Sequence, residues 1–269
     1  MKLSIVTAAI LGLVWCAGPI AAQAPKGGVP RTADGHPDLS GVWWRGADVG
    51  GKPAPGARGA APVGGGGRGA GAAAQPQTFA SLYTPAAQAK AKTLADKDDP
   101  ALSCTSTAFG TLNVSMFDVG AVAQIVQTPK FVIMLTETYN GFQIIPFDGR
   151  PHREEVPPSN RGDAIGRWDG DTFVVDKTNF TDNTWISAEG RVSFHSDALH
   201  IIERYRRVDK DTLEIEATLE DPKVLTKPWV VPKQTLVLAP FDQIMELACS
   251  GDESKAVMDA AAKQNAPKN

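Results

Sequence analysis

The pattern of hydrophobic and polar residues is most regular between His195 and Pro222, where it predicts two β-strands joined by a turn. From Leu213 to Glu220, apolar residues alternate with glutamate and threonine. A period of two places one face of a strand in a core and the other in water. The charged triplet Asp209-Lys210-Asp211 separates the two strands and forms the expected turn.

Two registers of this hairpin are possible, and a shift of one residue would exchange the faces of its first strand. With Arg206 opposite Glu214, Arg204 faces Glu216, and the inward residues are Leu199, Ile201, Glu203 and Tyr205. With Arg207 opposite Glu214, the inward residues are His200, Ile202, Arg204 and Arg206. We favour the first register because it pairs charges on the wet face and buries one charge. A buried ionisable group needs a partner or a function.

Further hairpins follow one another along the chain from Ala121 onward. The turn sequences Asn140-Gly141 and Asp169-Gly170 are typical of two-residue hairpins. The other predicted strands are Phe131–Tyr139, Phe142–Phe147, Ala164–Trp168, Thr172–Asp176, Trp229–Leu238 and Gln243–Cys249. Pro232 interrupts one of them, which indicates an edge strand or a bulge.

Consecutive hairpins without long helices favour a mainly β fold built as an antiparallel meander. Closing roughly nine strands into a barrel removes exposed sheet edges, so we predict a lipocalin-like β-barrel with a peripheral helix. A β-sandwich is the alternative. The helix is predicted over Phe79–Asp98, with Thr84 as N-cap and Pro85 in its first turn.

The chain divides into five segments by composition. Residues 1–22 form a predicted signal peptide, and residues 23–45 form a lead-in that ends in the first strand. Within it, Gly41-Val42-Trp43 matches the G-x-W signature of lipocalin-like barrels, whose Trp closes one end of the core; a Trp in an ordinary edge strand fits equally. Residues 46–77 are a Gly/Ala/Pro-rich linker. The barrel domain spans 78–250, and residues 251–269 form a C-terminal tail.

The N-terminal segment predicts export. Lys2 precedes an apolar stretch from Leu3 to Ala17 that is too short to span a bilayer, and small residues precede an expected cleavage after Ala22. No later apolar run is long enough for a transmembrane helix. We therefore expect a periplasmic or secreted protein without a membrane anchor.

Export makes the cysteine count informative. Removing the signal peptide takes Cys16 and leaves Cys104 and Cys249, an even pair in an oxidising compartment. We predict a disulfide between them, worth about 4–5 kcal/mol in the chain-entropy model. A catalytic thiol is the alternative. The formal net charge of −3 gives no reason to expect a nucleic-acid partner.

Several sequence blocks resemble a largely uncharacterised family of exported bacterial proteins. They are VPRTADGHPDLSGVW at 29–43, IVQTPKFVIMLTE at 125–137, DGRPH at 148–152, GRWDGDTFVVD at 166–176, HSDALHIIERYRR at 195–207 and DPKVLTKPW at 221–229. The resemblance covers most of the mature chain and implies an exported, β-rich fold with no particular chemistry. The Gly/Ala-rich insertion at 46–77 departs from the family pattern.

Histidines and one glutamate are the candidate catalytic residues. Histidine titrates near neutral pH and can move protons, and a carboxylate can orient it or act as a base. The candidates are His152, His195, His200 and Glu203. Each histidine also has a plain structural explanation, such as a turn residue or a ring bonded to a backbone carbonyl.

The candidate substrate-binding residues are Tyr139, Arg150, Trp168, Trp185 and Tyr205. Arg150 or Tyr139 would stabilise developing negative charge, and the aromatic rings would line a pocket or belong to the core. We expect no cofactor and no metal. His200 and Glu203 point to opposite faces of one strand, and no compact metal-binding motif is present.

Two functions remain open at this stage. One is a cofactor-independent acid–base enzyme, a lyase, isomerase or hydrolase, acting on a small organic molecule, possibly aromatic or carbohydrate-derived. The other is a non-catalytic binding protein that carries an apolar or aromatic ligand. Charge mixed into both faces of His200–Arg207 favours the enzyme, because carriers have mostly apolar walls. The sequence leaves the substrate and the oligomeric state open.

Overall fold

The computed structural model describes residues 28–44, 77–109, 122–137, 141–186 and 192–246. The strands are β1 (Gly41–Trp44), β2 (Ala123–Gln127), β3 (Phe131–Thr136), β4 (Gly141–Pro146), β5 (Asp163–Asp169), β6 (Thr172–Thr178), β7 (His200–Arg207), β8 (Thr212–Glu220) and β9 (Trp229–Leu238). The helices are η1 (Ala80–Leu82), α1 (Pro85–Ala91), η2 (Asp96–Asp98) and η3 (Pro100–Ser103).

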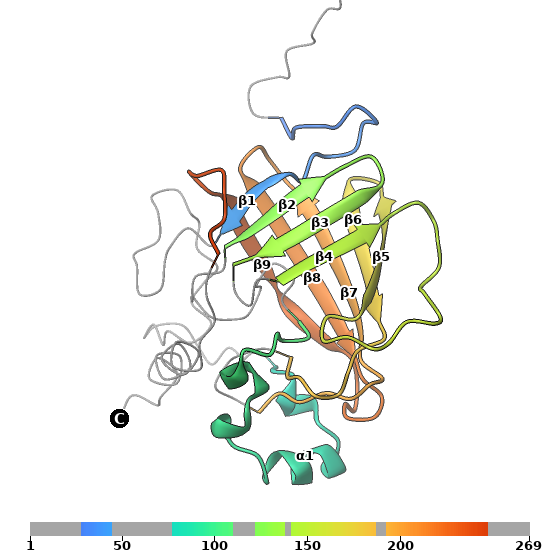
Figure 1. Ribbon diagram of the computed structural model, residues 1–269, viewed down its shortest axis with the longest axis vertical. Helices are drawn as coiled ribbons and strands as arrows, with labels where there is room; N and C mark the ends of the chain where they lie inside the picture. The colour runs from blue at the N-terminus through green and yellow to red at the C-terminus, as the bar shows by residue number, and fades with distance from the viewer. Residues whose placement is uncertain (1–27, 45–76, 110–121, 138–140, 187–191, 247–269) are drawn as a thin grey trace, which may run out of the picture.

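The strands form one antiparallel sheet in the order β4-β3-β2-β1-β9-β8-β7-β6-β5, curled into a nearly closed barrel (Figure 1). Two meanders, β1–β4 and β5–β9, are joined where β1 pairs with β9. The sheet ends at β4 and β5, which face each other across a seam. The predicted antiparallel barrel is confirmed, and a single continuous sheet replaces the alternative of a two-sheet sandwich.

The β7–β8 hairpin has the favoured register, with Arg206 opposite Glu214 and Arg204 opposite Glu216. The inward residues of β7 are Ile201, Glu203, Tyr205 and Arg207. Arg207 continues the same period of two and is a second buried charge, so the prediction of one buried charge in this strand is wrong. Its guanidinium lies 5.0 Å from the ring of Trp43 and donates to the carbonyl oxygens of Asp38 and Lys210.

Pro232 lies in a β-bulge, as its position in the strand predicted. Ile215 pairs with Gln234 and Ala217 with Val231, so two residues of β9 oppose one of β8. The bulge lets the proline avoid donating a ladder hydrogen bond within an otherwise paired strand.

Two elements differ from the prediction. Residues 243–246 are irregular, so the strand predicted over Gln243–Cys249 is wrong for its described part. The helix predicted over Phe79–Asp98 is a short α-helix, Pro85–Ala91, between 3-10 turns. Thr84 caps it by accepting from the backbone of Ala87, as expected. Its apolar stripe is too weak for a longer helix, because helix stability comes mainly from packing an apolar face.

Two hydrophobic clusters fill the barrel and one of its ends. The interior cluster includes Trp43, Met134, Ile145 and Phe173. The second cluster packs the helices and residues 180–186 and 192–194 beneath the barrel (Figure 1); it includes Phe79, Tyr83, Trp185, Phe194, Leu219 and Trp229. At the opposite end, the lead-in crosses β5–β6, where Arg31 pairs with Asp171 at 2.7 Å. The barrel therefore has covers at both ends.

Candidate functional site

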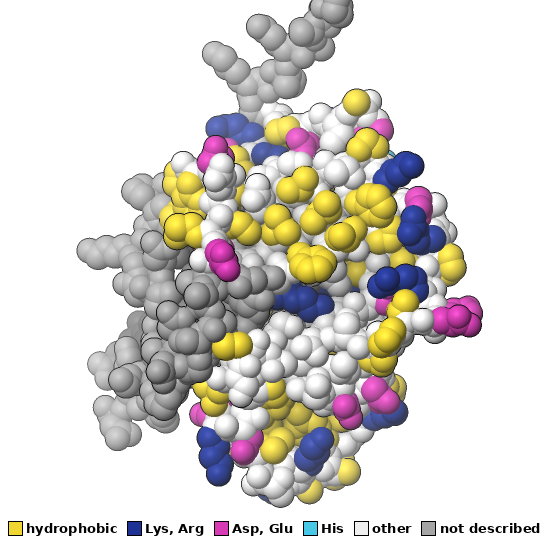
Figure 2. Space-filling view, in the orientation of Figure 1, with side chains coloured by type: hydrophobic (Ala, Val, Ile, Leu, Met, Phe, Trp, Pro, Cys, Tyr) yellow, Lys and Arg dark blue, Asp and Glu magenta, His cyan; other side chains and the backbone are white. Residues whose placement is uncertain are grey.

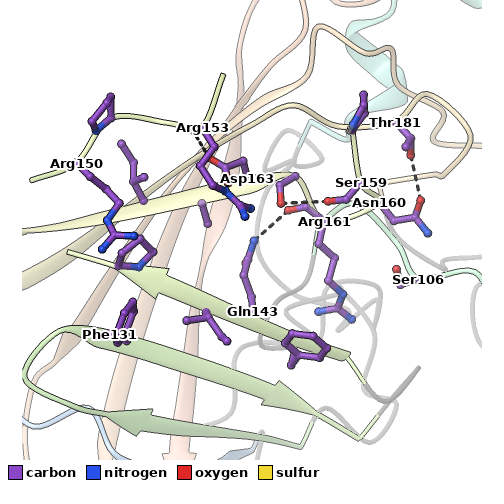
Figure 3. A pocket seen from close by; sticks show the side chains of 18 residues that line it. Ser106, Phe131, Gln143, Arg150, Arg153, Ser159, Asn160, Arg161, Asp163 and Thr181 are labelled. Atoms are coloured by element: carbon purple, nitrogen blue, oxygen red, sulfur yellow. Dashed lines mark hydrogen bonds and ion pairs between the residues drawn. The ribbon is translucent and has the colours of Figure 1, made fainter. Parts of the chain in front are cut away.

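A groove of about 750 Å³ lies over the seam between β4 and β5 (Figure 3). Its two walls come from different parts of the chain. Strands β3 and β4 supply one wall, and the connection from β4 to β5 supplies the other. The groove exists because these two strands end the sheet instead of pairing along their length.

The strand wall of the groove is apolar. Its apolar members are Phe131, Phe142, Ile144 and Pro146, and the residues Phe142 and Ile144 are 64% and 51% exposed. The outward row continues across the sheet, since Ile144 pairs with Ile133 and Ile133 with Val126. Figure 2 shows hydrophobic side chains gathered on the face that Figure 1 assigns to β2–β4. Contiguous exposed apolar surface of this kind marks an interaction site.

The opposite wall carries three arginines. Arg150 donates from Nε to Asp148 Oδ1 at 2.8 Å, and its guanidinium lies 6.0 Å from the ring of Phe131. Arg153 donates from Nε to Asp163 Oδ1 at 2.6 Å. Arg161 and Gln143 meet at the seam, where the Gln143 side chain donates to the Arg161 carbonyl at 3.0 Å. Figure 3 shows Arg150 and Arg161 extending from the loop side toward the strands.

Asp163 fixes the loop wall to the barrel. Its carboxylate accepts from the Arg153 backbone at 3.1 Å and contacts Nδ1 of His152 at 3.1 Å. Burial alone would raise the pKa of Asp163, but the hydrogen bonds from Arg153 and His152 outweigh it and the pKa is lowered. A carboxylate that stays charged is a strong acceptor and a weak base.

His152 and His200 meet on the outer face of the barrel. Their Nε2 atoms lie 3.1 and 2.9 Å from the same oxygen, Asp176 Oδ1. Nδ1 of His200 lies 3.4 Å from Glu220 Oε2. The three side chains at the centre, His152, Asp176 and His200, are 26–31% exposed. This histidine–aspartate cluster is within reach of solvent and borders the groove through Asp163.

His195 lies apart from the other histidines, in the cap at the end of the barrel. Its Nδ1 donates to the Ser196 carbonyl at 2.9 Å, and its Nε2 accepts from the Thr184 hydroxyl at 2.8 Å. The residue is 1% exposed, and burial lowers its pKa. Both ring nitrogens are satisfied by the neutral form, so His195 has a structural explanation.

Glu203 lies inside the barrel beside Lys177 and Tyr205. Its Oε2 is 2.7 Å from Lys177 Nζ and accepts from the Tyr205 hydroxyl at 2.7 Å. Burial lowers the pKa of Lys177, against the opposing effect of Glu203, and burial with the Glu203 charge raises the pKa of Tyr205. The buried charge expected from the register thus has a partner.

The structure therefore separates the predicted catalytic set. It brings His152 and His200 together but places His195 in the cap and Glu203 in the interior. Among the candidate substrate-binding residues, Arg150 lines the groove. Trp168 stacks on His36 at 4.5 Å, Trp185 belongs to the cap, and Tyr205 is buried with Glu203. Tyr139 and Cys249 lie outside the described residues, so the Cys104–Cys249 disulfide stays a prediction.

The sequence reasoning missed most of the groove. Its key residues are Phe142, Ile144, Arg153, Arg161 and Asp163. One signal was present: the run Phe142–Pro146 breaks the alternation, because apolar residues occupy outward as well as inward positions. When both faces of a strand are apolar, its outer face is expected to bind a ligand or to be covered by another element.

Within the described residues, no group of three or more His, Cys, Asp or Glu side chains is arranged to hold a metal ion. No helix in the described part of the chain is long and apolar enough to cross a membrane. Comparisons with family models, with curated proteins and with solved structures found no match.

Proposed function

We propose that this protein is an exported binding protein that holds a small organic molecule in the seam groove. One observation carries the proposal: an open groove of about 750 Å³ has exposed Phe142 and Ile144 on one wall and polar side chains on the other. Ligand sites combine apolar walls with a few placed polar groups and commonly span 300–1,000 Å³. Export is supported by the sequence of residues 1–22.

The barrel interior offers less to a ligand than a carrier of the lipocalin type would require. Large side chains occupy it, including Trp43, Met134, Phe173 and Tyr205, each at most 1% exposed. A ligand bound in the groove would lie on the outside of the barrel, where the seam interrupts the sheet.

A fluorescence titration with 1-anilinonaphthalene-8-sulfonate, which combines apolar rings with an acidic group, tests the location. The Phe142→Ser/Ile144→Ser variant should bind the dye at least about tenfold more weakly, because each exposed side chain contributes apolar contact. The matched control is Val230→Ser, which removes an apolar side chain that is 72% exposed on β9. Equal affinity of the wild type and the groove variant for the dye would show that the binding site does not lie in the seam groove.

Acid–base catalysis is a second candidate function, favoured by the histidine–aspartate cluster. Two imidazoles that share Asp176 Oδ1 are oriented by it, and both are partly exposed. A histidine that is positioned by a carboxylate can transfer protons as a general acid or base. Arg150 lies on the same loop and would stabilise developing negative charge.

Native mass spectrometry separates the two functions. Wild type and the His152→Gln/His200→Gln variant are purified from the exported fraction, and the small molecules bound to each are weighed. A substrate mass in the variant and a different product mass in wild type would indicate turnover. One identical mass at equal occupancy would favour the binding protein and count against catalysis by these histidines.

A further inference from the structure

The two walls of the seam groove differ in charge. Among the residues that line it, Arg150, Arg153 and Arg161 are cationic, and Asp163 is the one anionic side chain. Asp148, beside the groove, pairs with Arg150, and Asp163 pairs with Arg153, so each of these arginines shares its charge with one carboxylate. A ligand that is apolar throughout would leave the remaining guanidinium N–H groups of Arg150 and Arg153 without an acceptor.

The arginines differ in how their donors are used. Asp148 occupies Nε and Nη2 of Arg150, and Asp163 occupies Nε of Arg153. In the described part of the chain, no hydrogen bond involves Nη1 of Arg150 or either terminal nitrogen of Arg153. Their side chains are 48% and 66% exposed. Three guanidinium nitrogens at the groove therefore have hydrogen atoms to donate.

The guanidinium planes are held in place before any ligand arrives. Two hydrogen bonds to Asp148 orient Arg150, and Asp163, which is 5% exposed, orients Arg153. Pre-organised guanidinium groups bind carboxylate, sulfate or phosphate oxygens with charge-assisted hydrogen bonds, which are about twice as strong as neutral ones. The apolar wall is on the other side of the same groove, so the head of a ligand would contact the β4–β5 connection and its body would contact β3 and β4.

We propose that the ligand of this groove is an amphipathic anion, an apolar chain or ring that carries one acidic group. The acidic group lies against Arg150 and Arg153, with Arg161 adding positive charge, and the apolar body lies along Phe131, Phe142 and Ile144. This inference rests on the proposed binding function, because it names the ligand class of the same site.

A matched series of ligands tests the charge independently of the apolar body. Decanoate, 1-decanol and decyltrimethylammonium share a ten-carbon chain and differ in the charge of the head. Each is titrated against the full-length exported protein by displacement of the anilinonaphthalene dye. We expect decanoate to bind about tenfold or more tightly than decanol, and the cation to bind most weakly. The preference for decanoate should decline as sodium chloride is raised, because salt screens exposed charges.

The Arg150→Gln/Arg153→Gln variant assigns the preference to these side chains. It should lose most of the decanoate preference while its affinity for decanol stays unchanged, which shows that the apolar wall is intact. The control is Arg206→Gln, which removes an exposed positive charge from β7 without touching the groove. Retention of the preference in the double variant would overturn the assignment of the head to these arginines.

The possible failures are distinguishable. If the wild type binds decanol as tightly as decanoate, the anionic class is wrong and the groove remains a binding site. If none of the three ligands displaces the dye from the groove, the proposed function fails and the inference fails with it.

Discussion

Glu203 is the residue for which the prediction from the sequence agrees best with the structure. The hairpin register predicted one buried charge with a partner or a function, and Lys177 on β6 supplies the partner. The sequence of a single strand does not indicate which distant residue will pair with the buried charge. Lys177 is followed by Thr178 in a strand whose preceding residues are mostly apolar, and only the pairing of β6 with β7 brings the two charges together.

Removing one member of this pair should destabilise the barrel. Lys177→Met leaves Glu203 buried without its cation, and we expect the free energy of unfolding to fall by about 3–5 kcal/mol. The double variant Lys177→Met/Glu203→Leu should recover most of the loss, because apolar residues of similar volume replace both charges. Urea unfolding at neutral pH measures the difference. An equal loss in single and double variants would show that the ion pair is not the cause.

Asp99 should make stability depend on pH. Burial raises its pKa to about 6, and its buried Oδ2 atom has no hydrogen-bond partner among the described residues. The folded state then holds the proton more tightly than the unfolded state, so the free energy of unfolding should fall as pH rises from about 4 to 6. Asp99→Asn should raise stability at pH 8 by about 1–3 kcal/mol and leave it nearly unchanged at pH 4. Thermal unfolding at both pH values checks this, and a gain of equal size at both would argue against ionisation of Asp99.

At the scale of elements, the connection between β4 and β5 decides where the site is. It carries the arginine wall and is tied to the start of β5 by Asp163, which accepts from Arg153. Asn179, the residue after β6, also holds it, because its side chain donates to the Val156 carbonyl at 3.0 Å. At its end, Gly162 has a φ of +70°, and a Cβ there would lie 2.5 Å from the Thr178 carbonyl oxygen. The backbone can enter β5 at this point only because glycine has no side chain.

Two glycines in this connection should therefore respond differently to alanine. Gly149 has a φ of +82° but nothing within 4 Å of its would-be Cβ. Gly149→Ala should lower the free energy of unfolding by about 1–2 kcal/mol, the conformational cost alone. Gly162→Ala adds a backbone clash, so it should cost at least about 3 kcal/mol and weaken dye binding. Urea unfolding and dye titration on both variants give the comparison; equal effects would contradict the clash.

For the whole molecule, both ends of the barrel are covered and the seam is left open. The lead-in crosses one end and the helical cap packs beneath the other, while β4 and β5 end the sheet (Figure 1). An edge strand with exposed apolar side chains risks association with another sheet. The β4–β5 connection lies over the edge of β4 and hinders its pairing with another sheet. The same connection forms one wall of the groove.

The predicted Cys104–Cys249 disulfide belongs to this scale, because it would join the cap to the end of the chain. Protein from the exported fraction should resist thiol alkylation until it is reduced and unfolded, and intact mass spectrometry counts the blocked cysteines. The Cys104→Ser variant should unfold with up to about 4–5 kcal/mol less stability. Labelling of both cysteines in the native, unreduced protein would exclude the bridge.

The local pattern of the sequence predicted much of the barrel. Alternation, the turn at Asp169-Gly170 and the proline at 232 predicted the β5–β6 hairpin, the β7–β8 register and the bulge in β9. These features depend on neighbours within a few residues of each other, so a linear pattern contains them. The strand predicted after residue 242 failed because an apolar run alone does not supply a pairing partner.

The candidate site depended on contacts that are distant along the chain. His152 and His200 meet because β6 presents Asp176 between the loop and β7, and the arginines face Phe142 because β4 and β5 end the same sheet. In the sequence, His195 and Glu203 were candidates of the same kind as His152 and His200. In the structure, His195 lies in the cap and Glu203 lies in the barrel interior. The sequence by itself determined the fold class, most of the strands and the favoured register of the β7–β8 hairpin, since these follow from local periodicity. Only the tertiary structure decided which ionisable side chains converge and that the open seam forms a groove, because curling the sheet brings its two end strands together.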